Sequence, residues 1–105
     1  MQSKNAVSVN GIPIRLTKER LFHICQGHPE MEGCEDWIIE TISNPDKILE
    51  GDNGALMATK IYKKTPVSEN KHLIVVYKEQ EDDGFVITAY FIRRLPKWRK
   101  ILWQR

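Results

Sequence analysis

The chain has 105 residues, of which 41% are hydrophobic and 29% are charged, and this composition predicts one small soluble domain over residues 1–105 with one core. No apolar stretch approaches the ~18–20 residues that a membrane span requires, and residues 1–10 lack the charged and then apolar pattern of a signal peptide. Cys25 and Cys34 do not form a CxxC pair, so we expect reduced thiols in a cytoplasmic protein without a membrane partner.

Charge is unevenly distributed along the chain, although its net value is only +2. The tail over residues 93–105 contains no acid and carries +6, from Arg93, Arg94, Lys97, Arg99, Lys100 and Arg105. The preceding residues contain 10 Lys and Arg against 14 Asp and Glu, a charge of −4. An acidic body with a basic tail indicates a polyanionic ligand, or an acidic partner, at one end.

Two helices are predicted in the first half of the chain, after an extended segment over residues 7–16. Thr17 is a suitable N-cap for a helix that runs to about residue 26, in which apolar residues recur with helical spacing. A second helix is predicted over residues 35–43, because its isoleucines share one face and Pro45 ends it.

Four strands are predicted next, over residues 47–49, 56–63, 72–78 and 85–93, from β-branched residues separated by turns. In the last of these strands, successive residues are predicted to point to opposite faces of the sheet. A period of two places Phe85, Ile87, Ala89 and Phe91 on one face, which we expect to pack on the helices. The same period places Val86, Thr88, Tyr90, Ile92 and Arg94 on the other face, which we expect to be half open.

The segment after Pro96 is predicted to be a short basic helix, with Trp98, Ile101 and Leu102 on one side. The order of elements therefore predicts an α+β fold. In it, two N-terminal helices pack on one face of a roughly four-stranded antiparallel sheet, and the basic helix follows.

Neither a metal site nor a cofactor is predicted. His23 and His28 lie five residues apart, which does not align two ligands on one helix face, and the chain has no HExxH sequence. The glycines are scattered and form no phosphate-binding loop.

The run Gly27-His28-Pro29-Glu30 predicts an imidazole just beyond a helix C-terminus, since Pro29 disfavours helical dihedral angles at His28. The negative end of the helix dipole favours a charged ring there. With the carboxylate of Glu30 close by, the pair is a candidate acid–base device. The alternative is structural: the ring of His28 caps the helix by bonding its last carbonyls.

RNA cleavage without a metal needs a base for the 2′-hydroxyl, an acid for the leaving 5′-oxygen, and groups that stabilise the phosphorane charge. His28 and Glu30 could transfer the protons, Thr88 and Tyr90 could donate hydrogen bonds to phosphate, and Arg15 could supply charge. For attraction to the RNA backbone the candidates are Arg93, Arg94, Lys97 and Lys78.

Several short motifs occur in a recognisable order: Leu16-Thr17-Lys18-Glu19-Arg20, His28-Pro29-Glu30, Asn44-Pro45-Asp46 and Thr88-Ala89-Tyr90. In this respect the chain resembles small phage- and bacteria-associated proteins of the barnase/EndoU/colicin/RelE-like nuclease superfold, over roughly residues 15–93. The resemblance implies helices followed by an antiparallel sheet, and metal-independent ribonuclease activity, often as a toxin. It also implies that His28 is the principal acid–base residue and that Thr88 and Tyr90 line the sheet.

The leading hypothesis is therefore a toxin-like, metal-independent endoribonuclease that cleaves RNA through a 2′,3′-cyclic phosphate. The competing hypothesis is a non-catalytic module that binds RNA or a protein. A third is a toxin-like protein that acts only with a partner, such as an acidic antitoxin or immunity protein. The separation of His28 from Thr88 and Tyr90 in space distinguishes the first two, because an enzyme requires one concave site that joins all three.

Overall fold

The computed structural model describes residues 3–105. The fold begins with a β-hairpin. Strands β1 (Ser3–Val7) and β2 (Pro13–Thr17) pair antiparallel. Gly11 provides the tight turn between them, with a φ of +79° that favours glycine. The turn is fixed from outside the hairpin, because the side chains of Ser8 and Asn10 both donate hydrogen bonds to the carboxylate of Glu79.

Both predicted helices are present. Helix α1 (Lys18–Gly27) begins after Thr17, whose hydroxyl accepts a hydrogen bond from the backbone N–H of Arg20 at 3.0 Å, as expected for an N-cap. A 3₁₀ turn, η1 (Pro29–Met31), follows it, and helix α2 (Glu35–Ser43) comes next. No helix within residues 3–105 has the length and apolar character needed to cross a membrane.

The remaining strands lie in the second half of the chain. They are β3 (Lys47–Glu50), β4 (Leu56–Lys64), β5 (Glu69–Glu79), β6 (Gly84–Ile92) and β7 (Ile101–Gln104), with a 3₁₀ turn, η2 (Asp52–Gly54), between β3 and β4. All seven strands form one sheet in the order β1-β2-β6-β5-β4-β3-β7. The β2–β6 pair is parallel and the other pairs are antiparallel.

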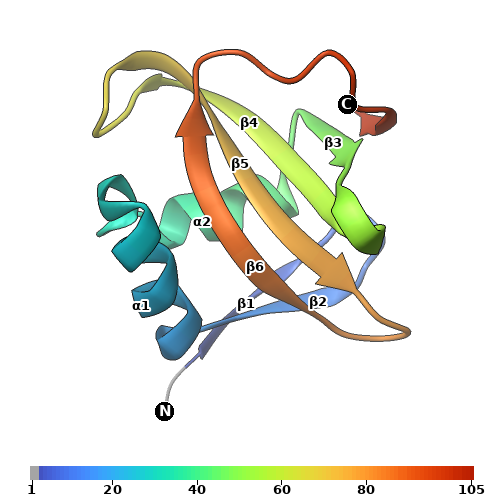
Figure 1. The fold of residues 1–105 in the computed structure, drawn as a ribbon. Helices are drawn as coiled ribbons and strands as arrows, with labels where there is room; N and C mark the ends of the chain where they lie inside the picture. The colour runs from blue at the N-terminus through green and yellow to red at the C-terminus, as the bar shows by residue number, and fades with distance from the viewer. Residues whose placement is uncertain (1–2) are drawn as a thin grey trace.

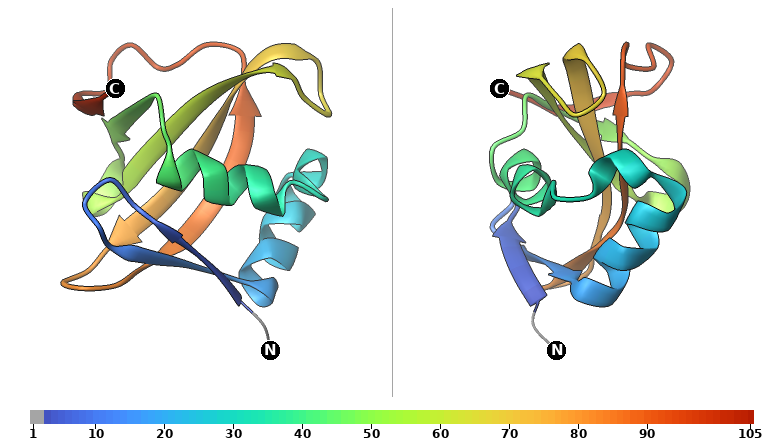
Figure 2. Two further views of the ribbon diagram at one scale, coloured as in Figure 1. Left: turned by 180° about the vertical axis from the view of Figure 1, so that it is seen from behind. Right: turned by 90° about the vertical axis from the view of Figure 1, so that its left-hand side faces the viewer.

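The sheet curves into a half-barrel around α2, as Figures 1 and 2 show. Helix α2 lies on the concave side and buries Ile38 and Ile42 completely. Helix α1 lies beside β6, where Arg20 donates a hydrogen bond to the backbone oxygen of Ile87. The core fills the space between α2, the hairpin and the strands β4 to β6.

The predicted fold class is wrong. The sheet has seven strands and is mixed, and the two helices do not lie side by side on one face of a four-stranded antiparallel sheet. The physical cause is the hairpin, for which the sequence predicts only a short extended segment over residues 7–16 with a turn signal at Asn10-Gly11. β2 pairs with β6 in parallel, Ile14 opposite Gly84 and Arg15 opposite Phe85, and thereby extends the sheet around α2. The layout implied by the resemblance is corrected in the same way.

The predicted C-terminal helix is also wrong, because this segment forms strand β7. Lys100 accepts a backbone hydrogen bond from Glu50 at 2.8 Å, and Arg105 donates one to Asp46 at 3.0 Å. Without β7, the free edge of β3 would leave these backbone groups to the solvent. The spacing of apolar residues in this segment predicted the buried face of a helix. In the structure Ile101 and Leu102 lie on β7 and are exposed.

Candidate functional site

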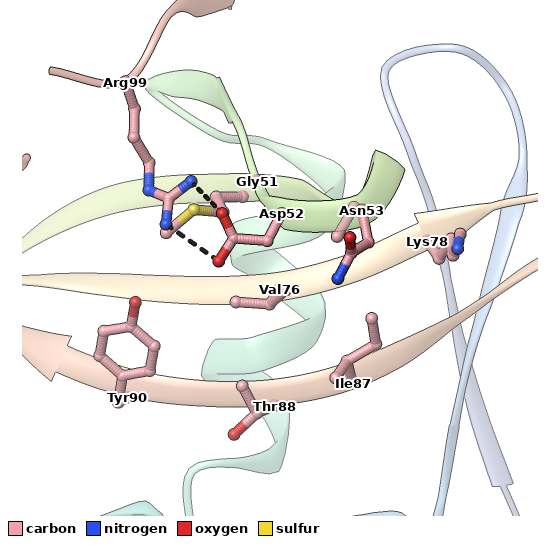
Figure 3. Close-up of a pocket in the computed structure, with 11 residues that line it drawn as sticks. Gly51, Asp52, Asn53, Val76, Lys78, Ile87, Thr88, Tyr90 and Arg99 are labelled. Atoms are coloured by element: carbon pink, nitrogen blue, oxygen red, sulfur yellow. Dashed lines mark hydrogen bonds and ion pairs between the residues drawn. The ribbon is translucent and has the colours of Figure 1, made fainter.

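A cavity of about 410 Å³ opens on the convex face of the sheet, the face turned away from α2. Its floor comes from β4, β5 and β6, and one wall comes from η2 and the segment before β7 (Figure 3). It is lined by Gly51, Asp52, Asn53, Ala55, Met57, Val76, Lys78, Ile87, Thr88, Tyr90 and Arg99. Two cations, a carboxylate, hydroxyls and an amide surround an apolar floor, a composition that offers hydrogen bonds and charges around a flat apolar surface.

A β-bulge in β6 shapes this floor. Val76 of β5 pairs with Thr88, and the next residue, Tyr77, pairs with Val86, so Ile87 has no partner. The bulge shifts the alternation by one residue. Val86 is therefore buried in the core with Ala89, whereas Ile87 lines the cavity together with Thr88 and Tyr90. The strict period of two predicted the reverse for Val86 and Ile87 and is wrong there, although it is right for Thr88 and Tyr90.

An ion pair closes one side of the cavity. The guanidinium of Arg99 lies 3.2 Å from Oδ1 of Asp52 and also donates a hydrogen bond to the backbone oxygen of Glu50 at 3.1 Å. The Arg99 side chain is only 14% exposed, while that of Asp52 is 78% exposed. The carboxylate thus neutralises the cation that lies deepest in the wall, and Lys78 is left as the unpaired cation among the described residues that line the cavity.

His28 lies beside the cavity and contacts it through Tyr90. The two rings stack with their centroids 5.5 Å apart and an angle of 28° between their planes. His28 has an extended φ of −135°, as Pro29 predicts, and its backbone N–H caps α1 by donating to Ile24 at 2.8 Å. Because the backbone makes the cap, the imidazole is free to lie on Tyr90.

Glu30 lies beside the same imidazole, with its Oε2 3.7 Å from Nδ1 of His28. Both side chains are partly exposed, at 39% for His28 and 28% for Glu30. The η1 turn produces this arrangement, because it returns the chain toward the ring directly after Pro29. An imidazolium at this position would face a negative charge on one nitrogen and leave the other nitrogen available.

The hydroxyls of Tyr90 and Thr88 face different sides of the site. Figure 3 shows the Tyr90 hydroxyl on the side of Arg99 and Asp52, while the hydroxyl of Thr88 points away from β5. Partial burial raises the pKa of Tyr90, the charge of Arg99 lowers it, and that of Asp52 raises it, with a net upward shift. The phenol therefore stays protonated near neutral pH and can donate a hydrogen bond.

The other predicted residues are distributed over the surface. Lys78 lines the cavity. Arg15 is exposed on β2 and lies 4.0 Å from a carboxylate oxygen of Asp83, outside the set of cavity residues. Arg93, Arg94 and Lys97 are exposed on the segment that leads to β7. The structure thus brings His28, Glu30 and Tyr90 together, places Thr88 and Lys78 in the cavity that Tyr90 also lines, and places Arg15 elsewhere.

Sequence reasoning missed Asp52, Asn53 and Arg99 as cavity residues, and Arg20 as the cation beside the bulge. The run Gly51-Asp52-Asn53-Gly54 indicated only a turn, and nothing local shows that it folds over the sheet. Arg99 was visible as part of the basic tail, but a helix over this segment would have directed it elsewhere. Its pairing with Asp52 depends on the β3–β7 pairing, which is long-range in sequence.

Cys25 and Cys34 are free thiols. Burial raises the pKa of both, and nearby negative charges add to the effect, so neither is an activated nucleophile. Within residues 3–105, no group of three or more His, Cys, Asp and Glu side chains could hold a metal ion.

The comparisons with known proteins add no relative. No family model matches the chain, and neither does a curated protein or a solved structure.

Proposed function

We propose that this protein is a metal-independent endoribonuclease that acts in the cytoplasm and cleaves RNA through a 2′,3′-cyclic phosphate. The observation that carries the proposal is the stacking of His28 on Tyr90, at 5.5 Å between ring centroids. Through this contact a partly exposed imidazole lies next to Tyr90, which lines the cavity together with Thr88 and Lys78, although His28 itself is not among the lining residues. The ordered motifs that resemble the nuclease superfold support the same proposal.

The chemistry assigned to the site balances with these groups. The 2′-oxygen attacks phosphorus, the bond from phosphorus to the 5′-oxygen breaks, and His28 accepts the 2′-hydroxyl proton. The imidazolium then donates that proton to the leaving 5′-oxygen. Glu30 is a positioning residue in this scheme, because its carboxylate lies 3.7 Å from Nδ1 and stabilises the charged ring.

Under this proposal the hydroxyl of Tyr90 stabilises the phosphorane charge, and Lys78 provides a cation on the opposite side of the floor. Thr88 would join them after rotation of its side chain, because its hydroxyl points away from β5. Arg93, Arg94 and Lys97 lie on the segment next to the cavity and attract the RNA backbone without reading its sequence.

The test is cleavage of single-stranded RNA in EDTA by the wild type and by His28→Ala, at matched folded concentration. Loss of a proton-transfer residue should lower the rate by ~10²–10⁴-fold. His23→Ala is the matched control, because His23 is exposed on the same helix and lies in a separate hollow with Thr17, Glu19 and Arg20. Equal activity of wild type and His28→Ala, or none in the wild type, would refute the proposal.

A non-catalytic RNA-binding module is the second candidate. One observation favours it: His28 contacts the ring of Tyr90 but is not among the residues that line the cavity. Under this alternative the wild type binds single-stranded RNA and leaves it intact, and His28→Ala binds it equally well. The charge of +6 on residues 93–105 also fits an acidic antitoxin or immunity protein as a partner of either form.

A further inference from the structure

Strand β7 forms one edge of the sheet. It pairs with β3, and no strand within residues 3–105 pairs with its other side. An edge strand presents a row of unpaired backbone N–H and C=O groups, which is a template for a further strand. Proteins commonly protect such edges with short strands, lysines, prolines, β-bulges or a covering loop. Strand β7 has part of this protection, because it has four residues, follows Lys100 directly and changes its register with β3 at Leu102.

The side chains on this edge are apolar and exposed. Ile101 and Leu102 are 47% and 45% exposed, and Trp98, directly before the strand, is 76% exposed. These residues lie close together in sequence, and the guanidinium of Arg99 covers one face of the Trp98 ring at 4.2 Å. Aliphatic side chains beside open backbone groups suit an extended peptide, which uses both at once.

Charge around this edge is positive and largely unpaired. Lys97 and Lys100 are exposed and form no ion pair with the residues that the structure describes, whereas Arg99 is paired with Asp52. Arg93 and Arg94 add exposed cations to the same segment. The other edge of the sheet differs, because Lys4 of β1 pairs with Glu35 and Asp36.

The charge pattern decides between occupants. A second copy pairing antiparallel through β7 would bring Lys100 of each chain close to Arg105 of the other, which is repulsive. RNA has no groups that extend a β-sheet, and it would not use the aliphatic side chains of Ile101 and Leu102. An acidic polypeptide satisfies the backbone, the apolar side chains and the cations together.

We propose that β7 binds an extended segment of an acidic protein partner by strand addition. Apolar side chains of the partner contact Ile101 and Leu102, and its carboxylates pair with Lys97 and Lys100. The proposal does not require ribonuclease activity, since it concerns the edge of the sheet and not the cavity, but it shares Lys97 with the surface proposed to attract RNA.

The test uses the full chain and a labelled peptide in which Val-Ile-Val is flanked by two Glu residues on each side. We expect measurable binding by fluorescence anisotropy, and slower amide hydrogen exchange at residues 101–104 when the peptide is bound. Lys97→Glu/Lys100→Glu should weaken binding by about tenfold or more. Leu102→Ser should also weaken it, by loss of apolar contact.

Matched controls separate the edge from general charge and hydrophobicity. Lys63→Glu/Lys64→Glu changes two exposed lysines on β4, and Phe22→Ser changes an apolar residue of α1 that is 67% exposed. Both should bind like the wild type. The proposal is overturned if the peptide does not bind at millimolar concentration or if the control variants lose binding equally. It is overturned as well if sedimentation shows a dimer through β7, or if amides 101–104 are protected by single-stranded RNA and not by the peptide.

Discussion

Tyr77 carries a buried hydroxyl without a hydrogen-bond partner among residues 3–105. Its side chain is 0% exposed and lies in the core cluster. Leaving a buried hydroxyl unpaired costs ~1–3 kcal/mol in proteins, and Phe removes only that oxygen. We therefore expect Tyr77→Phe to raise the free energy of unfolding by about 1 kcal/mol. This is the low end of the range, because loss of the oxygen leaves a small void that offsets part of the gain.

Urea titration measures this change as a shift of the midpoint at constant m-value. Tyr62→Phe is the comparison, because the Tyr62 hydroxyl donates to Oε1 of Glu40 at 2.5 Å. Its removal should lower the free energy of unfolding by about 1 kcal/mol. If Tyr77→Phe is destabilising to the same extent as Tyr62→Phe, the hydroxyl of Tyr77 has a partner and the reasoning is refuted.

The same residue predicts behaviour at alkaline pH. Burial raises the pKa of Tyr77 well above its ordinary value of 10.0, and the charge of Glu79 adds to the shift. The unfolded chain therefore loses the proton first, so the stabilising effect is complete below pH 10 and decreases as the pH rises further. Tyr77→Phe should make the decline of stability above pH 10 less steep, as urea titrations at several pH values would show.

Further predictions concern the cavity wall, the sheet and one histidine. Asp52→Asn should release Arg99 to contact phosphate, so the plot of log binding constant against log salt concentration for single-stranded RNA should become steeper by ~0.7. The urea midpoint should change little, because the Asp52 side chain is mostly exposed. Gly84→Ala should destabilise the protein by ~1–3 kcal/mol, since a Cβ there would overlap backbone of β5; Gly27→Ala, with open space, should not lower the thermal midpoint. Burial lowers the pKa of His72, so the unfolded chain binds its proton first and stability falls as the pH drops below ~6.5. His72→Gln should flatten that fall in acid titrations.

Local sequence predicted the two helices and the strands β3 to β6 well, but it missed the two strands of the hairpin, gave β7 as a helix and predicted the arrangement poorly. Thr17 and Pro45 marked helix limits that the structure reproduces closely, because caps and proline act within a few residues. The pairing of Ile14 with Gly84 and the addition of β7 to β3 depend on residues far apart in sequence. No periodicity within either segment contains that information.

The candidate site shows the same division. Pro29 predicted the backbone of His28, and the alternation of β6 placed Thr88 and Tyr90 on one face. The bulge at Ile87 reversed the predicted faces of Val86 and Ile87, since one extra residue changes the phase of a strand. Arg99 reached the cavity through the β3–β7 pairing, which a helical reading of the tail excludes.

The parallel β2–β6 pair has a consequence for how the chain folds. Ile14 pairs with Gly84, which lies about 70 residues later in the chain, so the sheet cannot close around α2 until both segments are present. The meander from β3 to β6 has short connections and can form before that contact. During synthesis the hairpin therefore emerges well before its partner strand, with Ile14 and Leu16 still without their core. We therefore expect the return of β6 to the hairpin to be a late and slow step of folding, because it forms a contact between residues far apart in the chain.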